Sequence, residues 1–118
     1  MLSIDPLLLR MPLITGVDMF NKVKVPTIAV VENMAYFDGA DGTRHHPFGQ
    51  GSADKLADLC VKGARVTQLP IATEVSESAA VGRPYVLDNL DTATGRAFSG
   101  LAAEVVLKLI RQRHESEP

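Results

Sequence analysis

The sequence predicts an α/β fold in which helices flank a parallel sheet, and three observations predict it. Thr27 to Val31 form a continuous apolar or β-branched run behind Pro26, which is typical of a strand buried on both faces. A second short strand, at Ala64 to Ile71, follows a helical segment from Ser52 to about Val61, and a parallel strand pair requires such a crossover. A long amphipathic helix then closes the chain.

A buried helix is the alternative for Thr27 to Val31, but the proline at its entrance and its β-branched content favour the strand. Upstream, apolar residues recur at three-residue spacing from Val17 to Val23, which predicts the end of an amphipathic helix within Met11 to Val23. Residues 1–12 receive no assignment, and the N-terminus resembles neither a signal peptide nor a transit peptide.

The connection from Ala35 to Gly51 is long, polar and rich in glycine. Asp41-Gly42 signals a tight hairpin turn, and Tyr36, Phe37 and Phe48 flank that turn. We therefore expect a small flap with aromatic residues at its base. Connections of this length tend to be functional or mobile.

The crossover helix is expected to begin at a Ser52 cap and to turn Leu56, Leu59 and Cys60 inward, with Gly63 behind its end. The segment after the second strand is weaker in pattern. Thr73 to Val81 predicts a helical turn with Thr73 as a possible cap, Gly82-Arg83-Pro84 breaks it, and Tyr85 to Leu87 is expected to be extended.

The last helix has the clearest pattern in the chain. Asp91 or Thr92 is its expected cap, and Glu104 and Lys108 form an i, i+4 pair beside its apolar face. The tail from Arg111 to Pro118 is polar and expected to fray. The apolar face consists of Phe98, Leu101, Ala102, Val105, Val106, Leu109 and Ile110.

Composition limits the classes of function. The chain has 118 residues, enough for one domain. Its net charge of −2 and pI of about 5.9 give no electrostatic footprint for nucleic acid or anionic lipid. No apolar run approaches the ~18 residues of a membrane span. The single cysteine, Cys60, cannot form an intrachain disulfide, so a reducing compartment is expected.

Candidate ligand-binding residues follow the first strand. Glu32 and Asn33 are expected just past its carboxyl end, where open α/β sheets bind ligands. The alternative is that Asn33 only bonds its own backbone, as asparagine often does.

Other chemical signals are weaker. Gly49-Gln50-Gly51 before a helix could present N–H groups to an anion or could be only a flexible entry to that helix. His45 and His46 are adjacent, so their side chains should diverge and are not a metal pair. Cys60, on the inward side of its helix, is interpreted as a small hydrophobe.

Several segments together resemble one family. They are Gly16-Val17-Asp18-Met19-Phe20-x-Lys22-Val23-x-Val25-Pro26, Val30-Val31-Glu32-Asn33-Met34-x-Tyr36-Phe37, His46-Pro47-Phe48-Gly49-x-Gly51, Leu69-Pro70-Ile71, the stretch Glu77 to Pro84, and Ala97-Phe98. This combination resembles the Mrp/ApbC family of P-loop ATPases, which carry and deliver iron–sulfur clusters. The resemblance covers about residues 15–112, and residues 1–14 match poorly.

The resemblance implies the carboxyl half of a P-loop NTPase domain of the SIMIBI type, without the half that holds the Walker A loop. It also implies ATP as the cofactor. Asn33 would correspond to the asparagine that bonds the adenine base, and Leu69, Pro70 and Ile71 would form a wall of the same pocket. An amide suits adenine because it can accept from N6 and donate to a ring nitrogen. Residues 113–118 would be a polar tail.

One departure from the family affects the cluster. Most members place Cys-x-x-Cys between the aromatic residue and the His-x-x-Phe-Gly segment, and two such pairs bridge a 4Fe-4S cluster across a dimer. Here that position reads Asp38-Gly39-Ala40-Asp41-Gly42. Carboxylate is a poor substitute for thiolate, so cluster binding at this loop is not expected. The pattern most resembles the plastid high-chlorophyll-fluorescence scaffold branch.

The expected function is that of a partial iron–sulfur carrier ATPase that contributes adenine recognition and dimer surface, without catalytic residues of its own. The implied partners are a second copy or a full-length family member, and apo iron–sulfur proteins, but neither nucleic acid nor membrane. The implied location is the plastid stroma or the cytoplasm. The alternative is a non-enzymatic interaction module that binds no nucleotide and pairs with a full-length relative.

Overall fold

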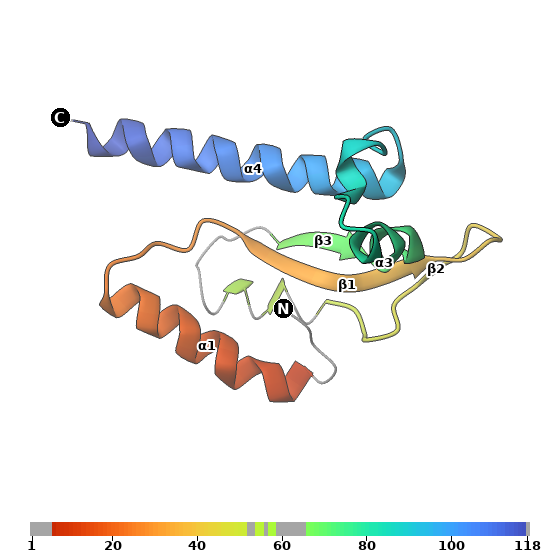
Figure 1. Ribbon diagram of the computed structural model, residues 1–118. Helices are drawn as coiled ribbons and strands as arrows, with labels where there is room; N and C mark the ends of the chain where they lie inside the picture. Colours follow the sequence, from red (N-terminus) through yellow and green to blue (C-terminus); the bar gives the residue numbers. More distant parts are fainter. Residues whose placement is uncertain (1–5, 52–53, 56, 59–65, 118) are drawn as a thin grey trace.

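The computed structural model describes residues 6–51, 54–55, 57–58 and 66–117. A small mixed sheet lies between helices (Figure 1). In chain order the elements are α1 (Pro6–Lys22), β1 (Val30–Asp38), β2 (Arg44–His45), β3 (Val66–Pro70), α3 (Thr73–Ala80), the 3-10 helix η1 (Tyr85–Leu87) and α4 (Ala93–Ser116).

The sheet has the order β2-β1-β3. β1 and β3 run parallel, with Val30 opposite Val66 and Glu32 opposite Gln68, as the predicted crossover requires. β1 and β2 are antiparallel and form the predicted hairpin around Asp41-Gly42. α4 and α1 lie on opposite sides of the sheet (Figure 1). The structure is therefore a mixed α/β fold in which β1 is the central strand of the sheet.

The first strand differs from the prediction in two ways. It begins at Val30, so Thr27 to Ala29 lie outside it, and it continues through Asp38. Its apolar run is half-buried, whereas we expected burial on both faces. The reason is the small extent of the sheet, because among the described residues only β3 pairs along the length of β1.

Helices α1 and α3 end in the same hydrogen-bonded motif. After α1, Val25 N–H donates to the Phe20 carbonyl at 2.8 Å and Lys24 N–H to the Asn21 carbonyl at 3.1 Å. After α3, Arg83 and Gly82 donate to the equivalent carbonyls, each at 3.0 Å. Gly82 (φ 70°) and Lys24 (φ 58°) both adopt the left-handed conformation that this motif requires. Gly82 thus ends α3 as predicted.

Three local predictions are wrong. Thr73 is not a cap, because Ala72 takes the N-cap position of α3 and makes no side-chain bond there. Tyr85 to Leu87 form η1 and are not extended, since Leu87 N–H reaches the Pro84 carbonyl at 3.1 Å. The tail does not fray at Arg111, because α4 stays helical through Ser116.

The predictions for the start and side of α4 are confirmed. Thr92 Oγ1 accepts from Gly95 N–H at 3.0 Å, so threonine is the cap. Lys108 Nζ lies 3.0 Å from Glu104 Oε1, and Thr67 Oγ1 of β3 donates to Glu104 Oε2 at 2.8 Å. This carboxylate therefore fixes which face of α4 turns toward the sheet.

The core of the described part is small. Its buried apolar residues are Val17, Ala35, Ala57 and Leu69. Asp54, Lys55, Ala57 and Asp58 are helical, in agreement with the predicted crossover helix. The predicted cap Ser52, the inward residues Leu56, Leu59 and Cys60, and Gly63 lie outside the described residues. No helix in the described ranges is long and apolar enough to cross a membrane.

Candidate functional site

A bulge interrupts the pairing of β1 with β3. Glu32 lies opposite Gln68 and Tyr36 lies opposite Pro70, so three residues of β1 stand against one residue of β3. Met34 in the middle of this bulge has φ 56°, a conformation that is costly for a side chain of its size. Asn33 Oδ1 accepts from Met34 N–H at 2.9 Å and supports the turn of the backbone. Bulges of this kind re-aim side chains and are common beside functional sites.

Glu32 and Asn33 do not follow the strand, as the sequence had suggested, but lie inside it. The bulge explains the difference, because it lets pairing resume at Tyr36 after the interruption. Glu32 accepts from Gln68 Nε2 at 3.0 Å and is therefore part of the strand pair. Asn33 is exposed at the bulge. The local bond to Met34 N–H matches the alternative interpretation, in which the Asn33 side chain only bonds the adjacent backbone.

Leu69 and Pro70 lie beside the bulge on β3, and Ile71 follows the end of that strand. Leu69 is 6% exposed and belongs to the core. Pro70 ends β3 opposite Tyr36, and Ile71 N–H donates to the Tyr36 carbonyl at 2.7 Å. The strand pair thus brings Leu69 to Ile71 and Asn33 to the same end of the sheet. Among the described residues, the Asn33 side chain bonds only the neighbouring Met34 N–H.

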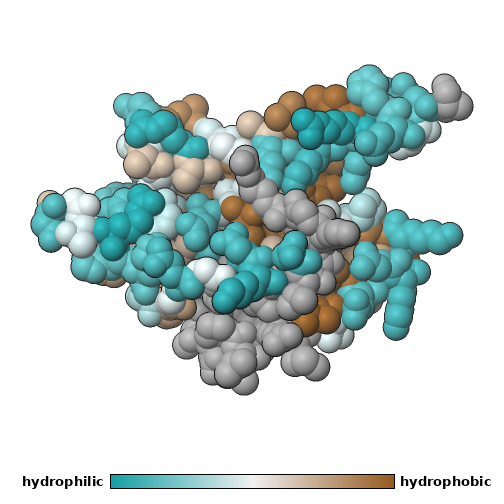
Figure 2. Space-filling view, turned by 180° about the vertical axis from the view of Figure 1, so that it is seen from behind, coloured by the Kyte–Doolittle hydropathy of each residue, from teal (hydrophilic) through white to brown (hydrophobic). Residues whose placement is uncertain are grey.

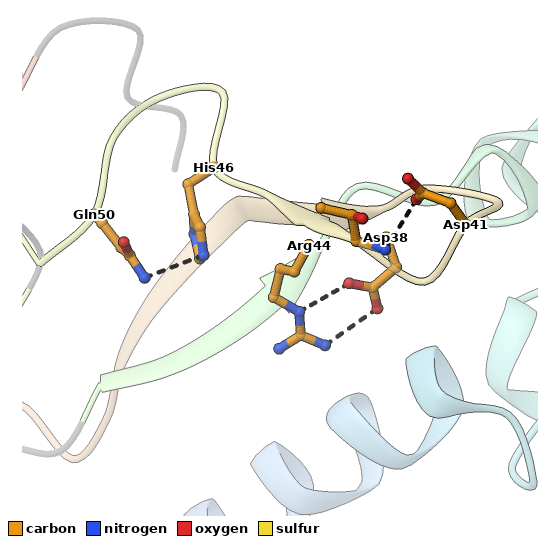
Figure 3. A network of polar contacts seen from close by, with 6 residues as sticks. Asp38, Asp41, Arg44, His46 and Gln50 are labelled. Atoms are coloured by element: carbon orange, nitrogen blue, oxygen red, sulfur yellow. Dashed lines mark hydrogen bonds and ion pairs between the residues drawn. The ribbon is translucent and has the colours of Figure 1, made fainter.

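The hairpin beyond the bulge is held by an ion pair. Arg44 Nε donates to Asp38 Oδ1 at 2.8 Å and Arg44 Nη2 donates to Asp38 Oδ2 at 3.1 Å (Figure 3). The guanidinium carbon also lies 3.8 Å from the centre of the Tyr36 ring. The hydrogen bonds from Arg44 lower the pKa of Asp38, and the same bonds raise the pKa of Arg44. The planar guanidinium of Arg44 and the planar carboxylate of Asp38, joined by two hydrogen bonds, therefore close the base of the flap.

The turn itself is also fixed by a carboxylate. Asp41 Oδ1 accepts from Thr43 N–H at 2.9 Å, and this backbone hydrogen bond lowers the pKa of Asp41 (Figure 3). Gly39 N–H donates to the Thr43 carbonyl at 2.8 Å, and Gly42 has φ 80°. Both acidic groups of the flap are thus engaged within the hairpin.

The two histidines have different partners, as their adjacency predicts. His45 stacks on Phe37, with ring centres 4.8 Å apart. His46 points toward Tyr36, 6.3 Å between ring centres, and its Nε2 lies 3.2 Å from Gln50 Nε2 (Figure 3). Nδ1 of His46 is buried without a partner. Over the described ranges, no group of three or more histidine, cysteine, aspartate or glutamate residues could hold a metal ion.

The glycine-rich segment after the flap forms a turn with its own hydrogen bonds. Gly49 (φ 92°) and Gly51 (φ 79°) both adopt left-handed conformations. Gly49 N–H donates to the His46 carbonyl at 3.2 Å, and the Gln50 side chain bonds His46. The Gly49 amide is therefore used inside a turn, which favours the interpretation as a shaped entry to the crossover helix.

Two features of the site were missed by the sequence interpretation. Nothing in the residue types predicts that Met34 turns left-handed, because the bulge is a property of the strand pair. The pairing of Asp38 with Arg44 was missed because a two-residue turn at Asp41-Gly42 would set Asp38 opposite His45, whereas the turn closed by Gly39 N–H and the Thr43 carbonyl sets Asp38 opposite Arg44.

A parallel strand pair that carries a long helix, with a short antiparallel strand beside it, defines a mixed α/β protein. The family model ParA, described as NUBPL iron-transfer P-loop NTPase, matches residues 11–106. The chain therefore belongs to this family of P-loop NTPases.

Three relatives illustrate the similarity. The chloroplastic Fe-S cluster assembly factor HCF101 of Oryza sativa subsp. japonica is 40% identical over 109 residues, which is 85% of this chain and 18% of that protein. An iron-sulfur cluster carrier protein of Aquifex aeolicus is 34% identical, over 74% of this chain and 24% of the relative. The iron-sulfur cluster transfer protein NUBPL of Mus musculus is 34% identical, over 80% and 30%. The chain spans less than a third of the length of each of these relatives.

Proposed function

We propose that this chain is the base-recognition part of an iron–sulfur cluster carrier ATPase. Residues 15–112 would form the carboxyl half of a SIMIBI-type parallel sheet with its helices, with residues 1–14 and 113–118 outside it. In this role the chain contributes to nucleotide binding and not to phosphoryl transfer, because no residue here is assigned to the β- and γ-phosphates.

The observation that carries the proposal is the bulge at Asn33 and Met34 beside the end of β3. The left-handed conformation of Met34 costs conformational free energy, and a regular strand pair would not require it. The bulge leaves the Asn33 amide exposed at the edge of the sheet. Asn33 Oδ1 already accepts Met34 N–H, which leaves Nδ2 as the group that donates to a ring nitrogen of adenine. Leu69 and Pro70 at the end of β3, with Ile71 directly after it, supply an apolar wall for the base.

The flap does not fit an iron–sulfur cluster. Its two carboxylates are engaged by Arg44 and by Thr43 N–H, and no thiol stands in the segment from Asp38 to Gly42. Thiolates are the usual ligands of such clusters. In this proposal a cluster, as cargo, is held elsewhere in the complete carrier before it passes to the apo iron–sulfur client.

The test places residues 11–106 in the matching segment of the Aquifex aeolicus carrier and measures ATP binding by calorimetry. Asn33→Ala should weaken ATP binding by about 1–2 kcal/mol, roughly 5- to 30-fold, because one hydrogen bond to the base is lost. Binding of inorganic tripolyphosphate, which has no base, should not change. Asn21→Ala, an exposed asparagine of α1, is the matched control and should leave both affinities unchanged.

An ATP affinity that Asn33→Ala does not alter would contradict the assignment. Equal loss of ATP and tripolyphosphate binding would also contradict it, because that result would reflect a general disturbance of the domain.

A second function is favoured by the open edge of β3. Among the described strands β3 pairs with β1 alone, so its other edge presents backbone groups that can pair with another chain. In this alternative the chain binds no nucleotide and pairs with a full-length relative. This alternative predicts that the chain binds a full-length relative saturably. It also predicts that the chain itself binds no ATP in that mixture. The location in the plastid stroma or the cytoplasm remains part of either proposal.

A further inference from the structure

Tyr36 contacts both the flap and the end of β3. Its backbone carbonyl accepts from Ile71 N–H at 2.7 Å, and the guanidinium carbon of Arg44 lies 3.8 Å from the centre of its ring. Tyr36 stands opposite Pro70, where strand pairing resumes after the bulge. It is half-buried, whereas Arg44 is exposed. The backbone of Tyr36 therefore holds the end of β3, and its side chain is held by the flap.

The position of Ile71 depends on Tyr36. Pro70 has no N–H, so the Ile71 amide supplies the donor to β1 at this end of the strand pair. Ile71 follows the last residue of β3, and it is 36% exposed. A shift of the Tyr36 backbone would therefore move Ile71, the exposed apolar residue beside the bulge.

The hairpin that carries Arg44 is short. β2 has two residues, and they pair with Phe37 and Asp38 of β1. A hairpin of this size is marginal on its own. The two hydrogen bonds from Arg44 to Asp38 join its strands (Figure 3), and the same guanidinium packs on the Tyr36 ring. One side chain thus closes the hairpin and fixes Tyr36.

The tip of the flap offers little apolar surface of its own. Figure 2 shows hydrophilic and neutral residues there, at the left-hand edge of the view. Between Asp38 and Thr43 the only apolar side chain is that of Ala40. The flap is therefore suited to act on a bound base through the residues that it holds in place, and Tyr36 is the one that bonds Ile71.

We infer that Arg44 is a positioning residue for base binding. The inference rests on the proposed function, in which Ile71 is part of the apolar wall for adenine. Arg44 fixes the Tyr36 ring, the Tyr36 carbonyl fixes the Ile71 amide, and Ile71 contacts the base. Arg44 acts along this path and not by contact with the nucleotide. Because its own contacts are exposed, its loss should change ATP affinity only about two- to fivefold.

The test uses the same hybrid carrier, with residues 11–106 in the Aquifex aeolicus protein, and measures ATP and tripolyphosphate binding by calorimetry. Arg44→Gln and Asp38→Asn should each weaken ATP binding about two- to fivefold and leave tripolyphosphate binding unchanged. The two variants change the net charge in opposite directions, so a long-range effect of charge would shift ATP affinity in opposite directions. The double variant should bind ATP as each single variant does, because all three lack the same contact.

Two further variants separate this path from a general effect of ion pairs. Arg83→Gln removes a comparably exposed bidentate pair, with Asp88, and should leave ATP binding unchanged. In a Tyr36→Leu background, Arg44→Gln should cause no further loss, because the guanidinium has no ring to cover. Thermal unfolding checks that each hybrid stays folded.

An ATP affinity that neither Arg44→Gln nor Asp38→Asn alters would overturn the inference, and so would opposite shifts from these two variants. An equal loss with Arg83→Gln would overturn it as well. Failure of the proposed function is seen separately, as an ATP affinity that Asn33→Ala leaves unchanged, and the inference would then fall with that function.

Discussion

At the scale of single residues, the flap shows how several side-chain contacts together fix a loop. Asp38 and Arg44 face each other across the hairpin, the guanidinium covers Tyr36, and His45 stacks on Phe37. Phe37, Asp38, Arg44 and His45 are exposed and only Tyr36 is half-buried among these groups, so each contact contributes little alone, and the geometry is held by several together. A second bidentate pair, Arg83 with Asp88, closes the loop around η1 in the same way.

These two pairs predict a selective change of pKa. Arg44→Gln should return the pKa of Asp38 to its ordinary value, since the hydrogen bonds from Arg44 lower it. Because the folded pKa is depressed, the stability from the pair is present above the ordinary aspartate pKa of about 4 and is lost as the pH falls through the folded value. Carbon-detected NMR titration of the carboxyl group measures this.

Arg83→Gln is the matched control for that titration. It should raise the pKa of Asp88, which the hydrogen bonds from Arg83 lower, and leave Asp38 unchanged. An Asp38 pKa that does not respond to Arg44→Gln would show that the ion pair does not persist in solution.

At the scale of elements, the sequence correctly predicted the features that depend on residues close together in the chain. The Thr92 cap, the pair of Glu104 with Lys108, the Asp41-Gly42 turn and the left-handed Gly82 are confirmed because each depends on residues within a few positions. The predictions failed where partners are distant. The start of β1, its bulge and the exposure of Val106, Leu109 and Ile110 on the predicted apolar face of α4 depend on which strands and helices meet, and periodicity does not contain that information.

The start of α4 gives a sharp test of local packing. A side chain at Gly95 would put its Cβ 1.8 Å from the Asn89 carbonyl oxygen, whereas a Cβ at Gly100 would meet nothing within 4 Å. Gly95→Ala should therefore destabilise the chain by about 3 kcal/mol, because backbone must move to relieve the overlap. Gly100→Ala should stabilise it by about 1 kcal/mol through helix propensity.

Urea unfolding followed by circular dichroism, at concentrations where the chain is monomeric, compares the two glycine variants. Equal effects at the two positions would mean that the loop before α4 does not pack on the helix as described.

At the scale of the whole molecule, family membership does not by itself supply an activity. The chain matches the iron-transfer P-loop NTPase family over residues 11–106 but spans less than a third of each relative compared. We expect the isolated chain to show no ATPase turnover above background, because phosphoryl transfer needs a lysine, backbone N–H groups and a metal around the phosphates. Release of phosphate in a magnesium-containing assay measures this. Turnover that a point substitution in this chain abolishes would contradict the prediction.

The sheet and core predict how the isolated chain unfolds. The radius of gyration is 16.1 Å, whereas a compact domain of this length has about 13.5 Å. No large side chain in the described part is fully buried, and β3 has an edge that no described strand pairs with. A core of this size leaves little free energy to offset conformational entropy. The open edge and the apolar run from Thr27 to Val31 favour association.

We therefore expect a broad thermal transition whose midpoint rises with protein concentration, because association stabilises the folded chain by mass action. Calorimetry at several concentrations, with light scattering on the same samples, measures both effects. A sharp transition at a midpoint independent of concentration, from a monomer, would mean that the chain completes its core without a partner.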